Sequence, residues 1–151
     1  LDSIGTILVG YLAGPSAGVL TGIVTNIAWG LTINPTTIPF AAGAAVIGLL
    51  AGLAGKYGLF RRWWTVLLAG LGTGLIAGFM GAPVAAFVFG GGLGVGTGSV
   101  VAALQATGQS LLGATTLQSL LSDPLDKTVA FLVVWLIALT IPERVKFQLA
   151  H

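Results

Sequence analysis

The feature that most constrains this chain is its shortage of charged side chains, because only 7% of its 151 residues are Asp, Glu, Lys or Arg. A soluble domain carries roughly 25% charged residues, and a globule of this size needs polar side chains to cover its surface. Here 56% of the residues are hydrophobic. We therefore expect lipid to surround most of the surface.

Lipid limits the secondary structures that can span it to helices and closed barrels, because every backbone N–H and C=O group must be paired internally. Barrel strands alternate apolar and polar residues, whereas this chain has long continuous apolar runs. The sequence therefore predicts an all-α, polytopic membrane helix bundle. We expect residues 1–151 to form a single transmembrane domain.

Turn-forming residues divide the apolar sequence into five expected spans, at residues 4–13, 15–31, 40–55, 65–80 and 128–141. Gly14 and Pro15 separate the first two, and the proline-containing stretch 32–39 is a connector between the second and third. Residues 123–127, Asp-Pro-Leu-Asp-Lys, are expected to cap the last span.

Two basic clusters predict the topology: Lys56, Arg61 and Arg62, and then Arg144 and Lys146. The positive-inside rule places both clusters, and with them the C-terminus, in the cytoplasm. Residues 81–121 then begin and end on the outer side, as a re-entrant element or a helical hairpin. Its stretch 90–98 holds six glycines in nine residues and is too flexible for the core of a helix. Two full crossings within residues 64–121 are the alternative, with one cluster outside.

Glycines recur every four residues in several of these spans, and this spacing lets helices approach closely because one stripe of each helix lacks Cβ bulk. We interpret them as helix-packing residues in a compact bundle. They are Gly10, Gly14, Gly18, Gly22, Gly48, Gly52, Gly70, Gly74 and Gly78.

Several chemistries are disfavoured by the residues that are present. There is no cysteine, and the one histidine, His151, ends the chain, so neither a Ser-His-Asp triad nor a thiol or metal site is expected. The glycine-rich run ends in Gly98-Ser99-Val100 without the lysine of a phosphate-binding loop. The six basic residues are too scattered for nucleic acid. We expect no enzymatic activity, no cofactor and no metal.

A set of polar and aromatic residues near the expected outer face could line a pocket for a small solute. For Asp123 a helix-capping role competes with ligand binding, for the glutamines interhelical hydrogen bonding competes, and Trp29 could be an interface anchor. The candidates are Asn26, Trp29, Asn34, Gln105, Gln109, Gln118, Asp123 and Lys127.

Several segments resemble the substrate-binding S components of energy-coupling factor (ECF) transporters, which capture vitamins and other micronutrients for ATP-driven import. Residues 1–6, Leu-Asp-Ser-Ile-Gly-Thr, and residues 11–26, which contain Tyr-Leu-Ala-Gly-Pro-Ser-Ala-Gly, resemble the second and third helices of this family. Residues 89–98, Phe-Gly-Gly-Gly-Leu-Gly-Val-Gly-Thr-Gly, residues 123–127, and Ile-Pro-Glu-Arg at 141–144 are similar to it as well.

The resemblance implies a six-helix bundle in a prokaryotic plasma membrane, with a pocket toward the outer face. It also implies a transmembrane coupling (T) component and two cytoplasmic ATPase subunits as partners. The five expected spans correspond to helices two to six, and the first helix of the family is absent from this numbering. Two other functions stay open, namely a membrane sensor domain of a signalling protein and a self-sufficient channel or facilitator.

Overall fold

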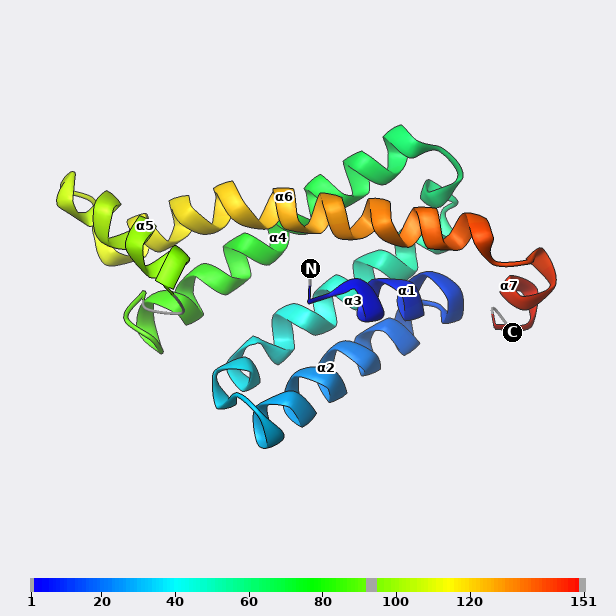
Figure 1. Cartoon of the computed structure of the whole chain (residues 1–151), viewed down its shortest axis with the longest axis horizontal. Helices are drawn as coiled ribbons and strands as arrows, with labels where there is room; N and C mark the ends of the chain where they lie inside the picture. The colour runs from blue at the N-terminus through cyan, green and yellow to red at the C-terminus, as the bar shows by residue number, and fades with distance from the viewer. Residues whose placement is uncertain (1, 92–94, 150–151) are drawn as a thin grey trace.

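A computed structural model describes residues 2–91 and 95–149, and these residues form helices without any strand (Figure 1). The all-helical prediction is confirmed. In chain order the elements are α1 (Ile4–Ala13), α2 (Pro15–Thr32), the 3₁₀ helix η1 (Pro35–Phe40), α3 (Ala41–Lys56), the 3₁₀ helix η2 (Leu59–Arg61), α4 (Trp63–Phe87), α5 (Val95–Ala106), α6 (Leu111–Thr140) and α7 (Glu143–Leu149).

The break between α1 and α2 lies at the predicted position. Gly14 has a φ of 95°, which is a backbone conformation that residues with a Cβ rarely adopt. Pro15 follows as the first residue of α2, where its missing N–H would have had no helical partner. The chain therefore reverses within one residue, and α2 packs back against α1.

The connector after α2 folds into η1, which is fastened to α2 by hydrogen bonds. The Asn34 side chain caps η1 by accepting from the Thr36 backbone N–H at 3.2 Å. The Asn26 amide donates to the Thr37 carbonyl oxygen at 3.2 Å, and the Thr37 hydroxyl donates to the Asn26 carbonyl oxygen at 2.9 Å. These bonds hold the start of α3 beside the end of α2.

Residues 81–121 hold the end of α4, which continues through Pro83 to Phe87, the separate helix α5, and the start of α6 at Leu111. That they form a hairpin or a re-entrant element in the membrane stays a prediction. The expected cap at residues 123–127 is wrong, since α6 runs through Pro124 without ending. The glycine-rich run becomes helical from Val95 onward, and its residues 92–94 lie outside the described part.

Helix α6 contains an internal proline at the point where it packs most closely on α4. A proline ring removes one helical hydrogen bond and crowds the preceding turn, yet α6 continues through Pro124. Pro124 faces Gly74 of α4, and a Cβ on Gly74 would collide with the Pro124 Cα. The missing side chain at Gly74 therefore permits the close contact between α4 and α6.

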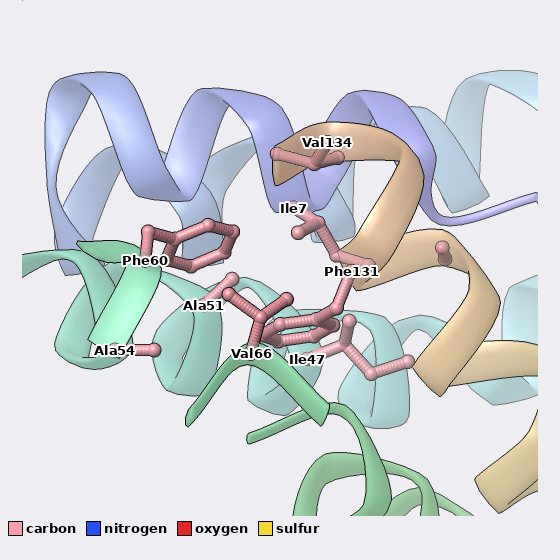
Figure 2. Packing of buried hydrophobic residues seen from close by; sticks show 9 residues of the cluster. Ile7, Ile47, Ala51, Ala54, Phe60, Val66, Phe131 and Val134 are labelled. Atoms are coloured by element: carbon pink, nitrogen blue, oxygen red, sulfur yellow. The ribbon is translucent and has the colours of Figure 1, made fainter. Parts of the chain in front are cut away.

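The helices form two groups that meet at one end of the molecule. Helices α1, α2 and α3 pack on one another, while α4 packs along α6 with α5 beside its start. A core of Ile7, Val66, Phe131 and Val134 joins the groups (Figure 2). Phe60 of η2 completes it, with its ring centroid 5.6 Å from that of Phe131. From this core the two groups diverge toward the left of Figure 1.

Eight of the nine glycines named in the sequence lie at helix contacts. A Cβ on Gly10 would stand 2.7 Å from the Gly48 carbonyl oxygen, and one on Gly70 would stand 2.7 Å from the Thr128 Cα. Gly18, Gly22, Gly48, Gly52, Gly74 and Gly78 also face another helix closely. Gly14 is the exception, because its neighbourhood is open and its role lies in the turn.

Two helical stretches within the described residues are long and apolar enough to cross a membrane. They are Pro35–Lys56, with a mean hydropathy of 1.9, and Trp63–Phe87, with a mean hydropathy of 1.7. Length and composition alone would also fit the core helices of a soluble protein. In the apolar 18-residue window of each stretch, 28% and 33% of the residues are buried inside the chain. The other residues of these windows are partly or fully exposed.

Candidate functional site

A cavity of about 640 Å³ lies between the two diverging groups of helices. Residues of α2, η1 and α3 line one side, and residues of α4 and α6 line the other. Asp2, Ser3 and Thr6 at the start of the chain and Lys127 of α6 also line it. Ligand sites for small molecules typically enclose about 300–1,000 Å³, so this cavity has the size of a small-solute site.

Lys127 forms a buried polar cluster in the cavity wall. Its ammonium donates to Asp126 Oδ2 at 2.7 Å, to Ser3 Oγ at 3.0 Å and to Asp2 Oδ1 at 3.2 Å. An ammonium has three N–H donors, so all three are engaged. The Lys127 side chain is only 8% exposed. Burying a charge without partners would be very unfavourable, and the three hydrogen bonds offset that cost. The cluster ties the N-terminal residues to α6.

The electrostatics of Asp2 follow from the same contacts. Partial desolvation raises the pKa of the Asp2 carboxyl, but the Lys127 ammonium and the Ser3 hydroxyl together lower it by more. The pKa of Asp2 therefore lies below its ordinary value. The Ser3 hydroxyl donates to Asp2 Oδ1 at 2.9 Å, which fixes the carboxylate at the edge of the cavity.

Asp123 lies one helical turn before Lys127 and also lines the cavity. It makes no hydrogen bond or ion pair with another residue in the described ranges, because the ammonium of Lys127 is turned to Asp2 and Asp126 instead. One of its carboxylate oxygens, Oδ2, lies 3.4 Å from the position that a Cβ on Gly78 would occupy. Asp123 therefore offers the cavity a carboxylate to which no described residue donates a hydrogen bond, although the Lys127 charge lies close enough to act on it.

The buried polar side chains of the described residues gather around this one cavity. They are Ser3, Thr6, Thr73, Thr115, Ser119 and Lys127. All except Thr73 line the cavity. Buried polar groups are costly in an apolar bundle unless they are paired or serve a ligand, so their concentration marks the cavity as the functional candidate.

Aromatic side chains form the apolar part of the wall. Trp29 of α2, which is 50% exposed, and Phe40 at the end of η1 both line the cavity. The Phe40 ring stacks on that of Phe89, with centroids 5.9 Å apart and an interplanar angle of 9°. Because Phe89 follows α4 and Phe40 precedes α3, this ring pair bridges the two groups of helices at the wide end of the cavity.

The structure brings together five of the eight residues that the sequence singled out. Asn26, Trp29, Gln118, Asp123 and Lys127 line the cavity. The remaining three lie outside it: Asn34 is exposed and caps η1, and Gln105 and Gln109 are exposed at the end of α5 and after it.

Sequence reasoning missed several cavity residues, including Thr6, Thr25, Thr115, Ser119 and Ser122. A signal for three of them was present, because Thr115, Ser119 and Ser122 follow one another at spacings of four and three residues and so share a face of α6. No comparable signal exists for Thr6 and Thr25, which are single polar residues on apolar helices.

Two further observations bear on identity. Among residues 2–91 and 95–149, no three His, Cys, Asp or Glu side chains gather as a metal site would require. Comparisons with protein-family models, curated proteins and solved structures give no match.

Proposed function

We propose that this chain is the membrane-embedded substrate-capture subunit of an ECF-type importer of a vitamin or another micronutrient. The observation that carries the proposal is a cavity that five of the six buried polar side chains of the described residues line, within a bundle that exposes many large apolar side chains. Such a subunit binds a small solute outside the cell, and partner ATPases power its release inside.

The apolar outer surface supports several membrane crossings. On α2, Leu20, Val24, Ile27 and Leu31 are exposed at spacings of four, three and four residues. Helices α4 and α6 carry similar exposed residues, including Phe87 and Leu125. At a rise of about 1.5 Å per residue, the 18 residues of α2 extend roughly 27 Å, close to the thickness of the bilayer core. We propose that α2, α3, α4 and α6 cross the membrane.

The charge distribution supports an outward-facing cavity. The connection between α3 and α4, which holds Lys56, Arg61 and Arg62, and helix α7, which holds Arg144 and Lys146, lie at the right-hand end of Figure 1. Helices η1 and α5 lie toward the opposite end and contribute to the cavity wall. Under the positive-inside rule the basic end is cytoplasmic, so the cavity faces outward.

Dependence on partners is proposed from the resemblance to S components together with the absence of a nucleotide-binding motif in the sequence. The glycine-rich run lacks the lysine that would hold phosphates. Accumulation of a solute against a gradient therefore needs an ATPase on another chain. The proposed partners are a transmembrane coupling component and two cytoplasmic ATPase subunits.

Orientation can be tested with single cysteines, because the chain contains none. Thr36→Cys lies in the exposed part of η1, and Glu143→Cys lies at the start of α7, where the side chain is 88% exposed. In intact cells a membrane-impermeant maleimide should label position 36 at once and position 143 only after permeabilisation. Labelling in the reverse order, or of both positions in intact cells, contradicts the proposed topology.

Partners can be identified by gentle purification of the tagged protein from its own membranes, followed by mass spectrometry. Recovery of one integral membrane protein together with two ATPase subunits supports the importer. A protein that purifies alone or as a homo-oligomer, even after crosslinking, contradicts it and favours a sensor domain or a channel.

A further inference from the structure

Acidic side chains outnumber basic ones among the described residues that line the cavity, and the basic side chain has no free hydrogen-bond donor. Two carboxylates, Asp2 and Asp123, and one ammonium, Lys127, line it, which leaves a formal charge of −1 at neutral pH. The single cation is already saturated, since Asp126, Ser3 and Asp2 accept its three donors. An anionic solute would have to displace these bonds to reach the ammonium. The cavity is therefore poorly suited to a carboxylate or phosphate ligand.

Asp123, unlike Lys127, is free to bind a solute. Its carboxylate faces the cavity and has no hydrogen-bond or ion-pair partner among the described residues, while Lys127, one turn away, is held by other groups. A carboxylate removed from bulk water is strongly stabilised by a cation that donates hydrogen bonds to it. Nothing in the described cavity wall supplies that cation, so the solute is the group that can.

The polar amides of the wall can pair with a solute that carries hydrogen-bond donors. The Asn26 side-chain nitrogen donates to the Thr37 carbonyl oxygen at 3.2 Å, and the Gln118 side-chain nitrogen donates to the Ser122 hydroxyl at 2.9 Å. Each amide keeps its carbonyl oxygen as an acceptor and a second N–H as a donor. The amides therefore serve either kind of polar group, and the preference for a cation rests on the Asp123 carboxylate, which only accepts.

The aromatic side chains define the shape of the ligand. Trp29 and Phe40 both line the cavity, and aromatic faces attract flat rings and cations. We propose that the solute is a small, flat molecule carrying a cationic amine or amidine group, and that Asp123 binds this group. This inference rests on the proposed capture function.

Three probes of equal shape and different charge test the inference: para-fluorobenzamidine, which is a cation, para-fluorobenzamide, which is neutral, and para-fluorobenzoate, which is an anion. Each is titrated against the purified protein in lipid nanodiscs, with empty nanodiscs as the blank, and binding is followed by fluorine NMR. A hydrogen bond to a charged group contributes enough to change affinity about tenfold or more. We expect the amidine to bind at least about tenfold more tightly than the amide, and the benzoate not to bind.

Asp123→Asn should remove this preference and bring the affinity for the amidine to within about threefold of that for the amide. Asp123→Glu keeps the charge and should retain part of the preference, which separates charge recognition from a loss of folding. Glu143→Gln is the matched control, because it removes one negative charge on α7, far from the cavity, and should leave all three affinities unchanged.

Tighter binding of the benzoate, an unchanged amidine affinity in Asp123→Asn, or no binding of any probe would overturn the inference. The purification experiment keeps this result separate from the proposed function. If the ATPase partners copurify and the amidine fails, the solute class is wrong while the importer stands. If the amidine binds and the ATPases are absent, the site stands while the importer fails.

Discussion

Replacing Lys127 with methionine tests whether the buried ammonium joins the two groups of helices. Methionine keeps the length and apolar stem of the side chain, but it cannot donate to Asp126, Ser3 or Asp2. The variant therefore removes three hydrogen bonds, of which the two to Asp2 and Ser3 link α6 to residues more than 120 positions away in the chain, while the third is to the neighbouring Asp126. We expect a large loss of stability from this single change.

The magnitude follows from the exposure of each partner. The Asp126 side chain is 30% exposed and accepts at 2.7 Å, so its charged hydrogen bond contributes about 1.5–3 kcal/mol. The buried Ser3 hydroxyl adds about 1 kcal/mol. Asp2 is 86% exposed, and an ion pair of that kind contributes close to zero, at most about 1 kcal/mol. The expected loss in the free energy of unfolding is about 2.5–5 kcal/mol.

Unfolding by sodium dodecyl sulfate in mixed micelles, followed by far-ultraviolet circular dichroism, measures this free energy. Lys146→Met is the matched control, since Lys146 pairs at 2.9 Å with Glu143, whose side chain is 88% exposed, and should cost less than about 1 kcal/mol. If Lys127→Met is destabilised no more than Lys146→Met, the polar cluster does not hold the bundle together and the reasoning is refuted.

Two further predictions concern packing and access to the cavity. Gly74→Ala should lower the free energy of unfolding by about 1–3 kcal/mol, because the added Cβ meets the backbone of Pro124. Gly72→Ala on the same helix is the control, since a Cβ there has open space and should be neutral or slightly stabilising. Equal effects of the two substitutions on unfolding in micelles would contradict the close approach of α4 and α6. Phe89→Ala breaks the ring pair with Phe40, a contribution of about 0.5–1.5 kcal/mol, so a cysteine at Ser119 in the cavity should react roughly 2- to 12-fold faster with a small methanethiosulfonate reagent. Phe87→Ala, at a ring that is 75% exposed, should leave that rate unchanged, and an equal acceleration in both variants would remove any role of the ring pair in access.

Local signals in the sequence were enough to predict most of the helical architecture. The shortage of charge predicts a lipid-facing surface, and Gly14 with Pro15 predicted a chain reversal that the structure shows at the same residues. The stretch 32–39 was predicted as a connector and holds most of η1, with Asn34 as its cap. These features depend on residues within a few positions of one another, so sequence alone carries them.

Long-range contacts decided how the helices pack and which residues line the cavity. A proline in sequence usually ends a helix, yet α6 continues through Pro124, where it packs closely on Gly74, fifty positions earlier. The spacing of Gln105 and Gln109 predicts a shared helical face, but α5 ends at Ala106, so Gln109 lies outside the helix and neither glutamine lines the cavity.

In the cavity, too, the sequence determined some features and the tertiary structure decided others. From the sequence, Asp123 and Lys127 are two polar residues near one another on a helix, and either could have bound a ligand. The tertiary structure brings Asp2 and Ser3 to Lys127 and thereby engages its ammonium, while it leaves Asp123 in the cavity wall without a hydrogen bond from any described residue. Sequence therefore determined which residues are polar, and the pairing of distant segments decided which of those charges is available, because a buried charge is neutralised by whichever groups the fold places within hydrogen-bond distance.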